Sequence, residues 1–117
     1  AEAEYVAQPS VVYTLPNVAS IGISEEDAKS QGLDYTLEHK LVPQWFNAKR
    51  INAEEYAYKT IVDTKTGHIL GAHLVGPEAA EIINLFSMAI TGKLTCEIVR
   101  KMIFAYPTWG NDIKSML

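Results

Sequence analysis

The feature that most constrains this chain is a pair of β-branched and aromatic runs, "EYAYKTIVD" and "HILGAHLVG", joined by the four residues "TKTG". Runs of this composition are typical of strands, and a short connection that contains glycine predicts a β-hairpin. Gly67 can adopt the positive φ angle that such a turn requires. An antiparallel pair of strands is therefore expected at residues 55–76.

Further strands are expected before this hairpin. The segments 10–16 and 18–23 are rich in β-branched residues, and residues 35–42 alternate between an apolar and a polar face. Between them, Ser24 followed by Asp27 has the spacing of a capping box, which predicts a short helix that ends at Gly32.

The last third of the sequence has helical periodicity. Pro77 is expected at the first position of a long helix whose apolar residues recur at helical spacing until Gly92. Thr95 and Thr108 are suited to cap a second and a final short helix. Strands followed by helices predict an α+β fold in which an antiparallel sheet is flanked by helices.

Composition limits the possible partners and the environment. A net charge of −4 and a pI of about 5.3 give no electrostatic footprint for nucleic acid, and no apolar run is long enough to span a membrane. The single cysteine, Cys96, excludes an internal disulfide and is typical of a reducing, cytoplasmic compartment, where a structural role is expected for it. His39, His68 and His73 lack the spacing of metal ligands, so no metal site is expected.

The length of 117 residues predicts one domain. Residues 1–8 are expected to be a linker or a remnant of cloning, and residues 9–117 the domain itself. Near its end stands "FAYPTWGND", residues 104–112, in which a tyrosine precedes a proline and an amide follows five positions after the tyrosine. Such a stretch is either a turn before a final helix or a loop that serves an active site.

Three stretches in order resemble one known family. "PSVVYTLPNVASIGISEEDA" and "YKTIVDTKTGHILGAHLVGPEAAEIINLFSMAI" are similar to the start and centre of the C-terminal dimerisation domain of the flavin-dependent pyridine nucleotide–disulfide oxidoreductases. These enzymes include glutathione reductase, dihydrolipoamide dehydrogenase and mercuric reductase. "FAYPTWGND" stands where that family has F-A-H-P-T-x-x-E. The resemblance covers residues 9–117.

The resemblance implies a function for the domain. In that family it supplies most of the homodimer interface, and its terminal loop reaches a flavin and a redox-active disulfide in the partner subunit. The glycine motifs for FAD and NAD(P)H and the paired cysteines are absent here, which implies a piece of a larger enzyme that carries those cofactors, binds none in this piece and is inactive alone. Its expected partners are a second copy and the FAD and NAD(P) domains of the same enzyme, with no nucleic acid or membrane.

The resemblance also places the site residues. Tyr106 and Asn111 occupy the positions of the catalytic histidine and glutamate, and Tyr106 with Pro107 is expected near the partner's flavin. A phenol that titrates near pH 10 is only about one part in a thousand ionised at pH 7, whereas an imidazole is poised there, and an amide cannot ionise. The replacement should change the chemistry of the site. The alternatives are an interface anchor for Tyr106 and a structural position in the final helix for Asn111.

The long helix is expected to lie between the sheet and the partner subunit, because it is apolar on more than one side. Its interface residues are expected to be Glu81, Leu85 and Met88, with Thr108 from the terminal loop. Two alternative functions stay open. The parent enzyme reduces oxygen, a quinone or a metal rather than a disulfide, or the chain is a free-standing interaction module.

Overall fold

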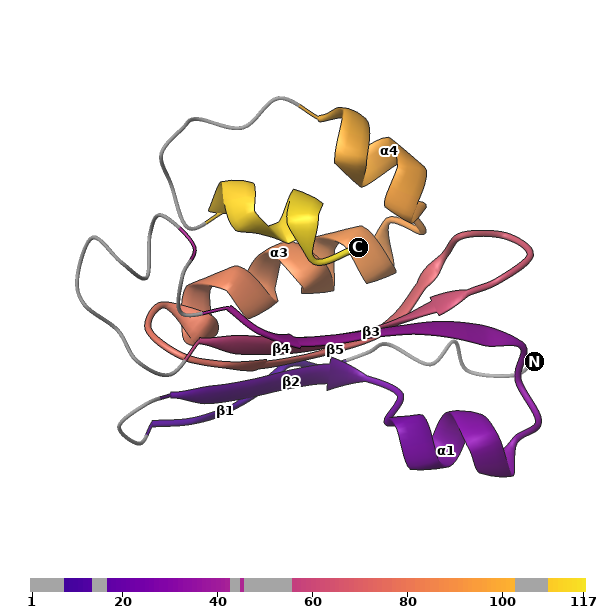
Figure 1. Cartoon of the computed structure of the whole chain (residues 1–117), viewed down its shortest axis with the longest axis horizontal. Coiled ribbons are helices and arrows are strands. Elements are labelled where there is room, and N and C mark those ends of the chain that lie inside the picture. Colours follow the sequence, from indigo (N-terminus) through magenta and orange to yellow (C-terminus); the bar gives the residue numbers. More distant parts are fainter. Residues whose placement is uncertain (1–7, 14–16, 43–44, 46–55, 103–109) are drawn as a thin grey trace.

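The computed structural model describes residues 8–13, 17–42, 45, 56–102 and 110–117, and Figure 1 shows their arrangement. The chain forms five strands, three α-helices and a 3₁₀ helix within these residues. In chain order they are β1 (Ser10–Val12), β2 (Val18–Gly22), α1 (Glu25–Ser30), β3 (Tyr35–Leu41), β4 (Ala57–Asp63), β5 (Ile69–Val75), α3 (Ala79–Thr91), α4 (Cys96–Lys101) and η1 (Gly110–Ser115).

The five strands form one antiparallel sheet in the order β1-β2-β5-β4-β3. The predicted hairpin is confirmed as the adjacent pair β4 and β5, with Gly67 at a φ of 77°. The Asp63 carboxylate accepts hydrogen bonds from the backbone N–H groups of Lys65 and Thr66, which closes the turn. The predicted α+β class, with an antiparallel sheet flanked by helices, is therefore confirmed.

Two of the predicted helix caps are confirmed, the third, Thr108, lies outside the described residues, and the predicted start of the long helix at Pro77 is wrong. The hydroxyl of Ser24 accepts from the Asp27 N–H at 3.1 Å, and that of Thr95 accepts from the Ile98 N–H at 3.2 Å. The long helix α3 starts at Ala79, two residues later than expected. The residue before it, Glu78, has a φ of 61° and no side-chain capping bond, so the left-handed turn there delays the start.

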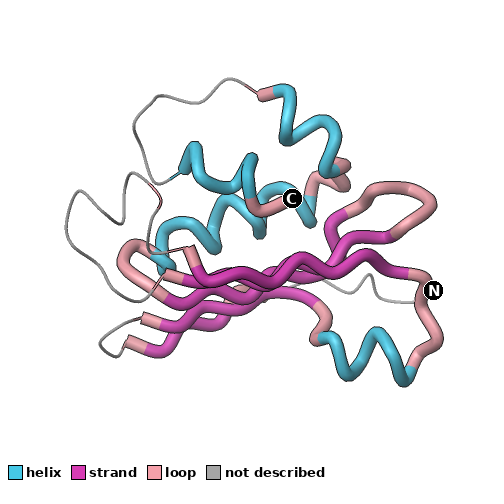
Figure 2. The backbone as a smooth tube through the Cα atoms, in the orientation of Figure 1, coloured by secondary structure: helices cyan, strands magenta, loops and turns pink. Residues whose placement is uncertain are grey.

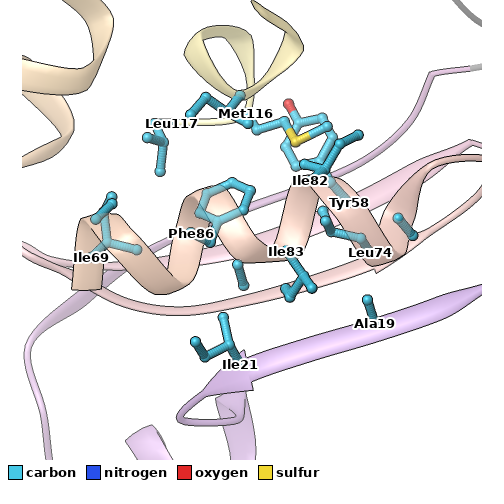
Figure 3. Packing of buried hydrophobic residues seen from close by; sticks show 14 of the residues in the cluster. Ala19, Ile21, Tyr58, Ile69, Leu74, Ile82, Ile83, Phe86, Met116 and Leu117 are labelled. Atoms are coloured by element: carbon cyan, nitrogen blue, oxygen red, sulfur yellow. The ribbon is translucent and has the colours of Figure 1, made fainter. Parts of the chain in front are cut away.

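The helices lie on both faces of the sheet but unequally. Figure 2 shows α3, α4 and η1 together on one side, whereas α1 lies on the other side at one end. The main core lies between the sheet and α3 (Figure 3), and its cluster includes Ile83 and Phe86 of the helix with Leu74 and Ala72 of β5. Within the described residues, no helix is both long and apolar enough to cross a bilayer.

The sheet face opposite α3 is covered by α1 only in part. Ile61 and Ala28 are fully buried but lie outside the main core cluster, as expected if α1 packs on this face. On the edge strand β3, the polar side chains turn toward the helices, and the Leu41 side chain on the other side is 74% exposed. The apolar alternation of this strand therefore points away from the core.

Two glycines opposite each other, Gly22 on β2 and Gly71 on β5, let the chain leave the sheet toward α1. A Cβ atom on Gly71 would overlap the carbonyl oxygen of Ile23. We expect Gly71→Ala to lower the free energy of unfolding by about 1–3 kcal/mol in urea denaturation, because the backbone must shift. Gly92→Ala, at a negative φ on an exposed helix end, should cost less than about 1 kcal/mol. Equal losses would contradict this explanation.

Candidate functional site

The predicted active-site residues lie at the C-terminal end of the chain. Tyr106, Pro107 and Thr108 fall outside the described residues, so their predicted roles stay predictions. Asn111 lies in η1, but its side chain is not among those that the structure describes. The structure does describe what holds η1 and the chain end in place.

Strand β4 holds the C-terminal segment with three hydroxyl groups. The Tyr56 hydroxyl, just before the strand, donates to the Asp112 carboxylate at 2.6 Å. The Tyr58 hydroxyl lies 3.3 Å from the Ser115 carbonyl, and the Thr60 hydroxyl donates to the Met116 carbonyl at 2.6 Å. Residues 56, 58 and 60 share one side of an extended chain, so their three hydroxyls reach successive residues of the C-terminal segment.

The last residues of the chain are held by α4 and by the core. The Arg100 Nε donates to the carbonyl oxygen of Leu117 at 2.8 Å, and Ile113, Met116 and Leu117 are buried in the main cluster. Figure 3 shows Met116 and Leu117 above α3. Residues 112–117 are therefore fixed by both polar and apolar contacts, and in the sequence they directly follow the stretch that contains Tyr106 and Asn111.

Burial and acidic neighbours control the titration of the two tyrosines. Burial, with the hydrogen bond and charge of Asp112, raises the pKa of Tyr56 far above its ordinary value. Burial and the nearby Glu38 carboxylate also raise the pKa of Tyr58. The ring of Trp45 stacks on Tyr58 and meets Tyr56 edge-on, with centroids 5.6 and 5.8 Å away. Both phenols are thereby kept neutral, as hydrogen-bond donors rather than nucleophiles.

These shifts predict a loss of stability in alkali. Above pH 10 the tyrosines of the unfolded chain lose their protons, while Tyr56 and Tyr58 in the folded chain keep theirs. The folded state then binds more protons, so the free energy of unfolding falls by up to about 1.4 kcal/mol per pH unit for each such residue. Chemical denaturation between pH 7 and 11 should show this slope. Tyr56→Phe should reduce the slope, and an unchanged slope in that variant would contradict the assignment.

The predicted interface residues on α3 share its outward side. Glu81 is exposed, Met88 is 70% exposed, and Leu85 between them is half-buried against the edge of the core. Their spacing of four and three residues places them on one side of the helix. Ile82, Ile83 and Phe86 lie on the other sides of the helix and are all buried. The helix is apolar on two sides, as its sequence indicates, and a large methionine is left in solvent.

The remaining candidates occupy structural positions. His39 and His73 lie on the sheet, His68 bridges to Thr95, and Cys96 begins α4 with its N–H donating to the Gly67 carbonyl at 2.8 Å. Among the described residues, no group of three or more histidine, cysteine or acidic side chains is arranged to hold a metal ion.

Sequence reasoning missed the hydroxyl contacts of β4. The alternation of Tyr56, Tyr58 and Thr60 was a usable signal, because hydroxyls on one side of a buried strand need acceptors. The Asp112 carboxylate, one residue after Asn111, accepts the hydrogen bond of Tyr56.

Comparisons with known proteins place this arrangement in a family. Residues 8–117 match the family model described as "Pyridine nucleotide-disulphide oxidoreductase, dimerisation domain". The chain is 43% identical to a 19.7 kDa protein in the mercuric resistance operon of Staphylococcus aureus, over 97% of this chain and 63% of that protein. It is 35% identical to dihydrolipoyl dehydrogenase 2 of Arabidopsis thaliana mitochondria, over 95% of this chain and 22% of that enzyme.

A solved structure agrees with both. The HOCl-induced flavoprotein disulfide reductase RclA from Escherichia coli matches 96% of this chain and 26% of its own, with a TM-score of 0.90 and 28% identity. The chain thus spans less than two thirds of each of these relatives, and about a quarter of dihydrolipoyl dehydrogenase 2 and of RclA. On its sequence and its fold, the chain belongs to the pyridine nucleotide-disulfide oxidoreductase family and is a dimerisation domain of that family.

Proposed function

We propose that this chain is the homodimerisation domain of an FAD- and NAD(P)H-dependent oxidoreductase and that it supplies a terminal loop to the active site of the partner subunit. Alone it binds no cofactor and is inactive. The outward side of α3, with Glu81, Leu85 and Met88, and Thr108 of the loop meet the second copy. Tyr106 and Asn111 take the places of the family's histidine and glutamate, and Tyr106 with Pro107 lies near the partner's flavin.

The observation that carries this proposal is the match to the family's dimerisation domain together with the anchored C-terminal segment. A loop that crosses to another subunit needs a rigid base. Hydrogen bonds from β4 and burial of the last residues supply that base, since residues 112–117 are tied to the sheet and to α3. The position of Met88 supports the interface, because methionine is enriched at protein interfaces relative to the rest of the surface.

A first alternative concerns the electron acceptor that the parent enzyme reduces. A phenol and an amide in place of an imidazole and a carboxylate provide no group that shuttles protons near neutral pH, which favours an acceptor other than a thiol-exchange disulfide. Oxygen, a quinone or a metal ion are such acceptors. One similar protein stands in a mercuric resistance operon and RclA has been solved as a Cu(II) complex, which makes a metal ion the first of these to test.

A free-standing interaction module is the second alternative, and one relative favours it. The match covers 63% of a 19.7 kDa protein, and the rest is too short for separate flavin and nicotinamide domains of about 100–150 residues each. The open reading frame upstream of this domain distinguishes the cases. Glycine motifs with paired cysteines support the first proposal, and glycine motifs without paired cysteines support another acceptor. The absence of both supports the interaction module. The single cysteine supports a reducing, cytoplasmic location.

Subunit complementation in the full-length parent tests the crossing of the loop. One subunit carries Tyr106→Ala with Asn111→Ala, and the other keeps its loop but has a substituted FAD-binding glycine motif. If the loop serves the partner, the heterodimer contains one intact site, built from the flavin of the first subunit and the loop of the second. Turnover should then reach about half of the wild-type value, the fraction of sites that a two-fold dimer restores.

The two variant homodimers are the controls, and each should be inactive. An inactive heterodimer would show that each loop serves its own subunit. A fully active Tyr106→Ala/Asn111→Ala homodimer would show that the loop residues have no part in the reaction. Either result would overturn the proposal for the loop and leave the dimerisation domain intact.

A further inference from the structure

The Tyr56 side chain is held on several sides just before β4 begins. It is 2% exposed, and the ring of Trp45 meets it edge-on with the ring centroids 5.8 Å apart. The backbone carbonyl of Tyr56 accepts a hydrogen bond from the Val42 N–H at 2.6 Å. Both the backbone and the ring of Tyr56 are thus fixed, and the direction of its hydroxyl is fixed with them.

The hydroxyl of Tyr56 donates to the Asp112 carboxylate at 2.6 Å, and Asp112 directly follows Asn111 in the chain. Hydrogen bonds to an ionised acceptor are shorter and about twice as strong as neutral ones. Asn111 and Asp112 belong to η1, a 3₁₀ helix of 6 residues. Runs of this helix longer than about three or four residues are uncommon because their hydrogen-bond geometry is poor, so outside contacts set the orientation of η1.

The acceptor distinguishes this contact from those of Tyr58 and Thr60. The hydroxyls of these two residues point at backbone carbonyls near the end of the chain. A carbonyl satisfies a buried hydroxyl as well as a carboxylate does, so burial of Tyr56 does not by itself require Asp112. The contact of Tyr56 reaches the first turn of η1 instead. It therefore holds the turn to which Asn111 belongs.

We propose that Tyr56 is a positioning residue of the terminal loop, whose hydroxyl holds the Asp112 carboxylate and so fixes the backbone at Asn111 for the partner's active site. Tyr56 is buried and acts through Asp112 rather than on the substrate. The inference rests on the proposed function, in which Asn111 serves the partner subunit. An error of about 1 Å in the position of an active-site group can lower a rate by about 100-fold, so the loss of this hydroxyl should be visible in turnover.

Subunit complementation locates the effect of Tyr56 in one subunit of the full-length parent. The reference heterodimer joins a subunit with an intact flavin site and Tyr106→Ala/Asn111→Ala to a subunit that supplies the intact loop. Tyr56→Phe in the loop-supplying subunit should lower turnover by about 10-fold or more. In the other subunit it should change turnover by less than about twofold, because the residues that it positions are already gone. A general loss of stability would lower turnover in both heterodimers equally.

Substitutions of Asp112 separate position from charge. Asp112→Asn keeps an oxygen that can accept from Tyr56 but removes the negative charge. In the loop-supplying subunit it should retain most of the turnover, because the geometry survives. Asp112→Ala removes the acceptor and should lower turnover as much as Tyr56→Phe. The double variant Tyr56→Phe/Asp112→Ala should lose no more than either single variant, as expected for two residues that act through one contact.

Thr60→Val is the matched control for stability. It removes a hydrogen bond of the same 2.6 Å length to the C-terminal segment, at the Met116 carbonyl. Met116 is also buried in the main cluster, so apolar contacts keep it in place without that bond. Thr60→Val should lower the free energy of unfolding about as much as Tyr56→Phe, since each removes one hydrogen bond of a buried donor. In the loop-supplying subunit it should leave turnover per flavin within about twofold of the reference.

The outcomes distinguish the inference from the proposed function. A loss that is equal with Tyr56→Phe in either subunit, or no loss in the loop-supplying one, would overturn the positioning role and leave the proposed function standing. Asp112→Asn that is as inactive as Asp112→Ala would assign the effect to the carboxylate charge and would also overturn it. An inactive reference heterodimer, or a natural protein without a flavin domain, would overturn both. Flavin absorbance and sedimentation confirm that each heterodimer is assembled before turnover is compared.

Discussion

Restoring Tyr106→His together with Asn111→Glu in the full-length parent is expected to raise disulfide turnover by about 10- to 1,000-fold, where the parent has the paired cysteines. An imidazole near neutrality can take and return the proton of a thiol, and a carboxylate beside it fixes its orientation. The pH profile of kcat/KM should gain a limb between about pH 6 and 7 that the unaltered enzyme lacks.

Single substitutions are the controls for this restoration. Asn111→Glu alone should have little effect, because the new carboxylate has no imidazole to orient for proton transfer. The rate at which NAD(P)H reduces the flavin should stay nearly constant in all variants, since thiol protonation is not part of that step. A parent that already reduces a small disulfide at rates that the double variant cannot improve would contradict the account, and Tyr106 would then be an interface anchor.

Met88→Asp is expected to weaken the dimer by about 100-fold or more, because each copy then buries an unpaired carboxylate in the interface. A two-fold interface introduces every substitution twice, so one carboxylate enters each of the two equivalent contacts. Because the Met88 side chain is 70% exposed in the single chain, the change should not unfold the domain itself. Sedimentation equilibrium of this chain and of the full-length parent measures the effect.

The matched control for the interface is Ser30→Asp. Ser30 is an exposed residue on α1, which lies on the other side of the sheet. Its substitution should leave the association constant unchanged. Circular dichroism of both variants should retain the native helix and strand content. An unchanged association constant in Met88→Asp would place the two-fold interface elsewhere, and the predicted roles of Glu81 and Leu85 would fall with it.

Local signals in the sequence predicted most of the fold correctly. The "TKTG" hairpin, the caps at Ser24 and Thr95 and the end of the long helix before Gly92 each depend on residues within four positions of one another, and each is confirmed. The start of that helix was misplaced because Pro77 has the right φ for a first turn but is followed by a left-handed Glu78. Local chemistry alone does not reveal that turn.

Long-range pairing could not be predicted in the same way. Strand β3 has apolar and polar sides, and its alternation alone does not say which side meets the helices. The sheet order decides this, because β3 is an edge strand whose partner β4 turns Tyr58 and Thr60 toward the chain end. The contact between Tyr56 and Asp112 joins residues 56 positions apart, and no local pattern indicates it.

The most direct test of the central claim, that two copies meet through the outward side of α3, is a distance measurement between subunits. With Cys96→Ser as background, spin labels at Thr91→Cys on α3 and, in a separate sample, at Ser30→Cys on α1 are measured by double electron–electron resonance. The account predicts a clear intersubunit distance for position 91 that is shorter than that for position 30, because α1 lies on the far side of the sheet. A longer distance at position 91 than at position 30, or no dipolar signal from a dimeric sample at position 91, would contradict it.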